Sequence, residues 1–166
     1  AVPSSSIGTH DVIVTNPDGA SGTFTVGDGG YTYTGSTSNG NTSSNSGDSI
    51  HCQIAMVKYD GDPIIAWSDN TSVNYEVYVK RLGCSGWQEM GTGSASGAGI
   101  SNTSASSSSV GVSQGPGKPF VVWKEYIDAN NDEIYGEQWN GSSWIELGGS
   151  ASSGGISTNS GHSSSP

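Results

Sequence analysis

The feature that most constrains the fold of this chain is an internal repeat with a period of 56 to 57 residues. The run GSASGAGIS, which begins at Gly93, returns as GSASSGGIS from Gly149. Three pairs of segments also align: Pro63–Trp67 with Pro119–Trp123, Glu76–Tyr78 with Glu133–Tyr135, and Trp87–Gly91 with Trp144–Gly148. The length changes fall in loops, whereas the apolar positions stay in step. Such a repeat is a structural unit, and a period of this size is typical of propellers and solenoids.

Composition excludes several classes of function. Only 31% of the chain is hydrophobic and 12% is charged, so the core is thin and the surface is rich in hydroxyl groups. Five Trp and seven Tyr residues favour a sparse β core over a disordered chain. The net charge of −10, with five basic residues, leaves little to neutralise phosphates, so nucleic acid and anionic membranes are poor partners. No apolar run reaches the roughly 18 residues of a membrane span.

Each repeat contains four candidate strands with a side-chain period of two. In the first repeat they are Ile54–Lys58, Pro63–Trp67, Tyr75–Arg81 and Gly86–Met90. The second is the driest and the third alternates as a half-exposed strand does, so polarity increases across the sheet. That is the order expected from the axis to the rim of a propeller blade. The sequence therefore predicts an all-β fold of tandem four-stranded antiparallel meanders that are propeller-blade-like.

The repeated Ser/Gly run lies where the chain must cross from the outer strand of one meander to the inner strand of the next. Small residues let such a segment lie over neighbouring sheets, and we expect Ile100 and Ile156 to anchor it with one apolar contact each. Clusters of Gly and Ser between periodic segments are usually loops. We interpret the run as structural.

Two stretches resemble known families. The sequence PIIAWSDNTSVNYEVYVKRLGCSGWQEMGTGSASGAGISNTS resembles the repeats of large secreted bacterial proteins predicted to form β-propellers, over about residues 46 to 166. Upstream, VIVTNPDGASGTFTV from Val12 to Val26 resembles the closing hairpin of an IPT/TIG domain, an immunoglobulin-like module of surface and adhesion proteins, chiefly through its Asn16-Pro17-Asp18-Gly19 turn. These resemblances imply an extracellular or cell-surface location. The predicted organisation is a partial IPT/TIG-like hairpin at 1–33, blade-like repeats at 34–92 and 93–148, and a Ser/Gly crossing segment at 149–166.

Both ends of the sequence look unfinished as a fold. Two meanders are fewer than the roughly four to eight blades that close a propeller, and the hairpin is only the last part of its module. Unpaired strand edges invite pairing with another chain. We expect the edges at Val12–Val26, 50–58 or 144–148 to bond to neighbouring copies or adjoining repeats.

The sequence gives no sign of a catalytic constellation. His10, His51 and His162 lack partners at metal-ligand spacing, and we interpret them as exposed loop or strand-end residues. No serine lies in a G-x-S-x-G elbow. Glu76 and Glu133 occupy equivalent positions, which favours a role in strand pairing or surface polarity. We expect a protein that is not an enzyme.

One segment has the character of a metal site, and calcium is the single cofactor that the sequence suggests. Asp128, Asn130 and Asp132 offer oxygen ligands at alternate positions, as at the start of a calcium loop. The Gly expected next is Glu133, and the twelfth position is Trp139. A polar hairpin loop held by Asx turns is the alternative.

Cys52 and Cys84 both belong to the first repeat, where the repeat alignment gives them Ser108 and Gly141 as counterparts. Two cysteines in a chain that resembles secreted proteins suggest a disulfide. The predicted meander, however, separates them towards opposite ends of the sheet, whereas a disulfide needs Cα atoms within about 7 Å. The sequence therefore favours an intrachain disulfide no more than free thiols or an interchain disulfide.

Three functions are compatible with these patterns. The first is a non-enzymatic structural or adhesive protein, a component of a surface layer, stalk or filament. The second is a carbohydrate-binding lectin assembled from two-blade subunits, with Trp87 and Trp144 stacking on sugar. The third is a fragment of a propeller glycosidase, because paired carboxylates meet only in the fold. The candidate glycosylation sites are the Ser/Thr runs and the sequons at Asn41, Asn70, Asn102 and Asn140.

Overall fold

The computed structural model of the chain describes residues 11–15, 21–27, 30–33, 42–43, 46–56, 62–83, 86–114 and 118–166. The chain divides into two compact units, residues 1–44 and 45–166. In the part of the chain that the structure describes there is no helix, and hence none long and apolar enough to cross a membrane.

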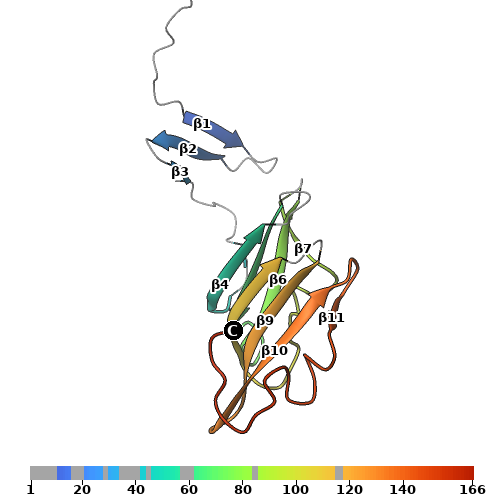
Figure 1. Ribbon diagram of the computed structural model, residues 1–166. Coiled ribbons are helices and arrows are strands. Elements are labelled where there is room, and N and C mark those ends of the chain that lie inside the picture. Colours follow the sequence, from blue (N-terminus) through green and yellow to red (C-terminus); the bar gives the residue numbers. More distant parts are fainter. Residues whose placement is uncertain are drawn as a thin grey trace, which may run out of the picture. The chain divides into compact units, whose positions relative to one another are not determined.

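The first unit contains a three-stranded antiparallel sheet in the order β1–β2–β3 (Figure 1). Its strands are β1 (Asp11–Thr15), β2 (Ser21–Gly27) and β3 (Gly30–Tyr33). β1 pairs with β2 so that Val12 lies opposite Phe24. The turn at 16–19, which carries most of the resemblance to an IPT/TIG domain, lies outside the described residues, so that assignment stays a prediction.

The second unit consists of two four-stranded antiparallel sheets, each a simple meander. The first sheet contains β4 (Ser49–Met56), β5 (Pro63–Asp69), β6 (Glu76–Gly83) and β7 (Gly86–Glu89). The second contains β8 (Ser107–Gln114), β9 (Pro119–Asp128), β10 (Asn131–Trp139) and β11 (Trp144–Glu146). The predicted all-β fold with tandem four-stranded antiparallel meanders is confirmed.

The two sheets share their pairing register as well as their strand order. Trp67 on β5 lies opposite Tyr78 on β6, as Trp123 on β9 lies opposite Tyr135 on β10. The first strand of each sheet also has an irregularity at one equivalent place, with His51 at φ 52° and Ser109 at φ 51°. The repeat in sequence is therefore a repeat in hydrogen bonding.

The equivalent irregularities correct the alignment of the first strands. His51 matches Ser109, so the offset there is 58 residues and the counterpart of Cys52 is Val110 instead of Ser108. β9 begins two residues sooner after the end of β8 than β5 begins after the end of β4. Alignment on the Trp-containing strands alone cannot detect this shift, because it is compensated before β9.

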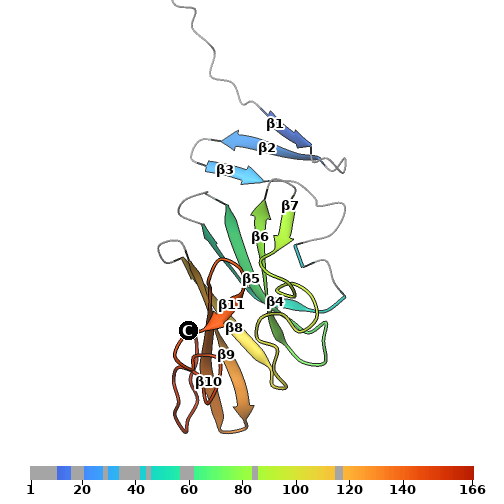
Figure 2. The same cartoon turned by 90° about the vertical axis from the view of Figure 1, so that its right-hand side faces the viewer.

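The core of the second unit runs through both sheets. β8 contacts β4, β5 and β6, so the inner strand of the second sheet packs on the first sheet (Figure 2). Stacked ring pairs, Trp67 with Tyr78 and Trp123 with Tyr135, have centroids 5.9 and 6.4 Å apart. One apolar cluster joins the two sheets, formed by Ile64, Ala66, Val77, Val79, Met90, Ile100, Val110, Val121, Trp123 and Tyr135.

Two features of the strands differ from the sequence prediction. The first strand begins at Ser49 instead of Ile54 and is largely exposed. The first half of β6, from Glu76 to Val79, is fully buried instead of half-exposed. The cause of this burial is the Ser/Gly segment that follows β7, because it bonds to β6 where β7 does not reach.

Candidate functional site

The two Ser/Gly segments, residues 90–106 and 147–163, act as partners for the exposed edges of β6 and β10. In the first, the N–H of Val79 donates to the carbonyl of Ser94 at 2.7 Å, and the N–H of Ile100 donates to the carbonyl of Val77 at 2.8 Å. In the second, the N–H of Gly136 donates to Ser150 at 2.8 Å, and the N–H of Ile156 donates to Ile134 at 2.6 Å. Each crossing segment thus satisfies backbone groups that β7 or β11 leaves unpaired.

The side chain of a buried glutamate also holds each Ser/Gly segment in place. Glu76, 1% exposed, accepts hydrogen bonds from the Ser101 hydroxyl at 2.5 Å and from the N–H of Thr103 at 3.3 Å. Glu133, 2% exposed, accepts from the Ser157 hydroxyl and from the N–H of Asn159. The repeated glutamates are therefore buried acceptors that hold the crossing segments. The predicted role in surface polarity is wrong for both.

A second buried carboxylate in each sheet holds the start of the first strand. Glu125 accepts hydrogen bonds from the hydroxyls of Thr103 and Ser107 and from Trp123 Nε1, the last at 3.0 Å. Asp69, its counterpart, accepts from the Ser49 hydroxyl at 2.5 Å. Asp is one methylene shorter than Glu, and Trp67 Nε1 is buried with no hydrogen-bond partner.

The equivalent glutamates differ in acidity because their surroundings differ. Burial raises the pKa of Glu76, and the nearby charge of Glu125 from the second sheet adds to this increase. The hydrogen bond from Ser157 lowers the pKa of Glu133. Both glutamates are buried, but the charge of Glu125 acts on Glu76, and no such charge contributes to the shift of Glu133.

A cavity of about 370 Å³ lies between the first Ser/Gly segment and the second sheet. Trp144 forms one wall; its Nε1 donates to the carbonyl of Met90 at 2.8 Å, and its ring lies 5.8 Å from that of Trp139. The other described residues that line the cavity are Gly91, Thr92, Ser94, Gly99, Ile100, Asn102, Glu137, Ser142 and Ser143. Of the two predicted sugar-stacking residues, Trp144 therefore lines this cavity. Trp87 is half-buried on β7 of the first sheet.

Glu137 is the acidic group of this cavity. Desolvation, followed by the charge of Glu146, raises the pKa of Glu137 to about 7. Glu146 lies directly opposite it on β11, whereas the equivalent pair in the first sheet is Lys80 opposite Glu89. Glycosidases need two carboxyl groups that flank the bond to be cleaved. Of the described residues that line the cavity, Glu137 alone carries one.

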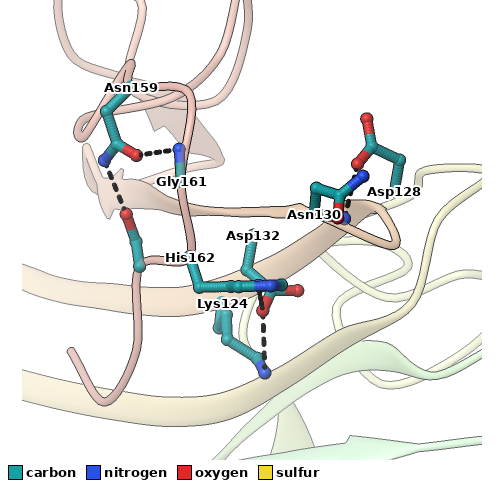
Figure 3. Close-up of polar contacts among 8 residues, drawn as sticks. Lys124, Asp128, Asn130, Asp132, Asn159, Gly161 and His162 are labelled. Carbon is teal, nitrogen blue, oxygen red and sulfur yellow. Dashed lines mark hydrogen bonds and ion pairs between the residues drawn. The ribbon is translucent and has the colours of Figure 1, made fainter.

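The predicted calcium ligands point in different directions (Figure 3). Asp128 accepts a hydrogen bond from the N–H of Asn130 at 2.8 Å, which is the Asx turn of the alternative interpretation. Asp132 lies 2.9 Å from His162 Nδ1 and 3.6 Å from Lys124 Nζ. Among the residues that the structure describes, no group of three or more His, Cys, Asp or Glu side chains gathers. The calcium site stays a prediction.

The contact between His162 and Asp132 is one that sequence reasoning missed. The two residues form a parallel bridge, and the N–H of Ser163 donates to the carbonyl of Asp132 at 2.8 Å. The same bond joins Ser107 to Tyr75 in the first repeat, at 2.7 Å. Ser107 and Tyr75 are one repeat period before Ser163 and Asp132. The repeat is therefore the signal in the sequence that relates the segment around His162 to Asp132.

The remaining predicted sites are distributed over the second unit. Cys52 is exposed on β4, while Cys84 lies outside the described residues, so the disulfide stays a prediction. Asn102 and Asn140 are exposed and Asn70 is half-buried, whereas Asn41 lies outside the described residues. Asn140 Oδ1 accepts hydrogen bonds from the N–H groups of Ser142 and Ser143, so this side chain already holds a turn.

Comparison with known proteins gives no family assignment. Neither a protein family nor a curated protein sequence matches this chain significantly.

Proposed function

We propose that this chain is a non-enzymatic structural or adhesive protein of the cell exterior, built from propeller-blade-like repeats that stack on one another and on neighbouring copies. The observation that carries the proposal is the use of the buried carboxylates. The carboxylates of Glu76, Glu125 and Glu133 accept hydrogen bonds from hydroxyls, N–H groups and an indole, and these bonds hold the fold together. A carboxylate so occupied contributes to architecture.

Repetition of the same hydrogen bonds supports a scaffold. The stability of a repeat protein is approximately the sum of the intrinsic stability of each repeat and of the interfaces between neighbouring repeats. Each added repeat therefore extends the structure without a new kind of interaction. The two sheets share both a register and a polar network. Surface layers, stalks and filaments use such units, and the partial IPT/TIG-like hairpin agrees with a location at the cell surface.

The test is the state of association of the full chain. Sedimentation velocity over a range of concentrations, with negative-stain microscopy of the concentrated protein, is expected to reveal regular assemblies larger than one chain. A protein that stays monomeric at every concentration contradicts the proposal.

A lectin is the second candidate, favoured by the cavity beside Trp144. An aromatic wall with hydroxyl, amide and carboxyl groups around it suits a sugar, which offers an apolar face and a ring of hydroxyls. Screening against a glycan array tests this candidate. Binding that Trp144→Ala abolishes and Val73→Ala preserves supports it, since Val73 is fully exposed and does not line the cavity.

A further inference from the structure

The second Ser/Gly segment exposes side chains whose counterparts in the first Ser/Gly segment are buried. Met90 is 5% exposed and Ile100 is 8% exposed, because the second sheet covers them. Their counterparts, Leu147 and Ile156, are 45% and 52% exposed. We call Leu147 and Ile156 the trailing face.

The opposite end of the unit exposes the complementary set. Val110 on β8 is 5% exposed and belongs to the core that joins the sheets, and Val112 packs against that core. Their counterparts on β4 are Cys52, which is exposed, and Ile54, which is 62% exposed. We call Cys52, Ile54 and Trp87 the leading face.

The chain therefore carries both halves of the interface that it already forms between its own two sheets. We propose that a second copy of this chain docks head to tail, with its leading face on the trailing face of the first. This inference rests on the proposed function, and it adds which surfaces meet and in what orientation. A contact of this kind joins two different surfaces, so it repeats and generates a ring or a filament.

The internal interface also specifies a hydrogen bond for the contact between copies. Trp144 Nε1 donates to the carbonyl of Met90 across the two sheets. Trp87 is the counterpart of Trp144, and Leu147 is the counterpart of Met90. In the assembly, Trp87 Nε1 donates to the carbonyl of Leu147 in the neighbouring copy.

Residues 163–166 partly occupy the docking position. The N–H of Ser163 bonds to Asp132 as the N–H of Ser107 bonds to Tyr75, and Ser165 has φ 54° where Ser109 has φ 51°. These residues thus follow the path along which β8 begins. A docking β4 has to displace them, and Ser164, Ser165 and Pro166 are exposed. A chain without residues 163–166 therefore associates more tightly.

The experiment uses two full-length variants, each blocked on one face, and sedimentation velocity. Ile54→Glu blocks the leading face, and Ile156→Glu blocks the trailing face. Each variant alone is expected to stay monomeric, while an equimolar mixture forms a one-to-one complex and nothing larger. Val73→Glu, on a fully exposed residue outside both faces, is expected to assemble like the wild type.

The outcomes separate the inference from the proposed function. A wild-type chain that stays monomeric contradicts both. A wild type that assembles while either blocked variant also assembles alone, or while the mixture stays monomeric, overturns the head-to-tail contact and leaves a self-assembling protein.

Two further variants test the details of the contact. Trp87→Phe keeps most of the ring but removes the donor, and it is expected to weaken association by about tenfold, which corresponds to about 1.4 kcal/mol. Deletion of residues 163–166 is expected to strengthen association severalfold. Unchanged affinity in both variants overturns the proposed geometry.

Discussion

Glu125 illustrates at the scale of one residue how polar groups stabilise a thin core. Its carboxylate serves the hydroxyls of Thr103 and Ser107 and the indole of Trp123, in a site that is 2% exposed. Removal of the acceptor leaves buried donors unpaired, at a cost of about 1 to 3 kcal/mol. We predict that Glu125→Ala lowers the free energy of unfolding by about 2 kcal/mol or more. Urea denaturation measures this loss.

Asp48→Ala is the matched control for this substitution. Asp48 is exposed, and its hydrogen bonds with Asn70 use its backbone N–H and carbonyl, which alanine retains. Its effect is expected to stay within about 0.5 kcal/mol. Equal losses for the two variants would contradict the role assigned to Glu125.

Glu137 makes the stability depend on pH near neutrality. Its pKa of about 7 in the folded protein exceeds its ordinary value of 4.5, so the folded state holds a proton that the unfolded state has released. Stability from this group is therefore lost as the pH rises from about 4.5 to 7. We predict that Glu137→Gln flattens this part of the stability profile and adds about 1 to 2 kcal/mol at pH 8. Urea denaturation at pH 5 and at pH 8 measures the effect.

Glu89 provides a control of opposite sign. The hydrogen bond from Ser96, followed by backbone N–H groups, lowers the pKa of Glu89, so its charged form stabilises the fold above its unfolded pKa. That contribution disappears as the pH falls through the folded pKa. Glu89→Gln is expected to lower stability at pH 8, and a gain there would refute the sign of the argument.

At the scale of the element, the Ser/Gly segments depend on glycine at one close approach. A Cβ atom on Gly99, which has φ 62°, would lie 2.1 Å from the carbonyl oxygen of Val77. Gly97 has nearly the same φ, 60°, but a Cβ there meets nothing within 4 Å. Gly99→Ala therefore adds a backbone clash to the strain that Gly97→Ala also carries. We predict that Gly99→Ala costs about 1 to 3 kcal/mol more than Gly97→Ala.

Thermal unfolding of the two variants side by side checks this difference. Gly155 repeats the arrangement, with a Cβ position 2.3 Å from the carbonyl oxygen of Ile134. Gly155→Ala should resemble Gly99→Ala. Similar melting temperatures for Gly97→Ala and Gly99→Ala would mean that the segment does not hold its edge of β6 tightly.

The elements that the sequence predicts well are those with a strong local pattern. The Trp-containing strands and their hairpin partners emerge because apolar alternation and turn residues are local signals. The sequence also predicts that the Ser/Gly segments connect one sheet to the next. It does not predict their hydrogen bonds to β6 and β10, because a Ser/Gly run is equally compatible with a loop that makes no such bonds. Ser101 and Ser157 recur at nearly the same spacing as Glu76 and Glu133. This recurrence is the signal in the sequence that pairs Ser101 with Glu76 and Ser157 with Glu133.

At the scale of the whole molecule, the sequence gives a repeat but not the asymmetry of its burial. Leu147 and Met90 look alike in the sequence, and only packing separates a residue that is 45% exposed from one that is 5% exposed. Glu76 and Glu133 are both buried, yet their pKa values shift in opposite directions. Position within the stack therefore decides the properties of equivalent residues.

The net charge of the chain sets how its association responds to salt. Two copies that each carry a charge of −10 repel one another, whereas the two faces proposed to meet are apolar. Screening shortens the reach of the repulsion from about 10 Å at 0.1 M salt to about 3 Å at 1 M and leaves the apolar contact intact. We predict that association strengthens steadily between about 0.05 and 1 M NaCl. Sedimentation velocity follows the change, with the Ile156→Glu variant as a control that stays monomeric throughout. Association that weakens as salt is added would show that ion pairs, and not apolar faces, hold the copies together.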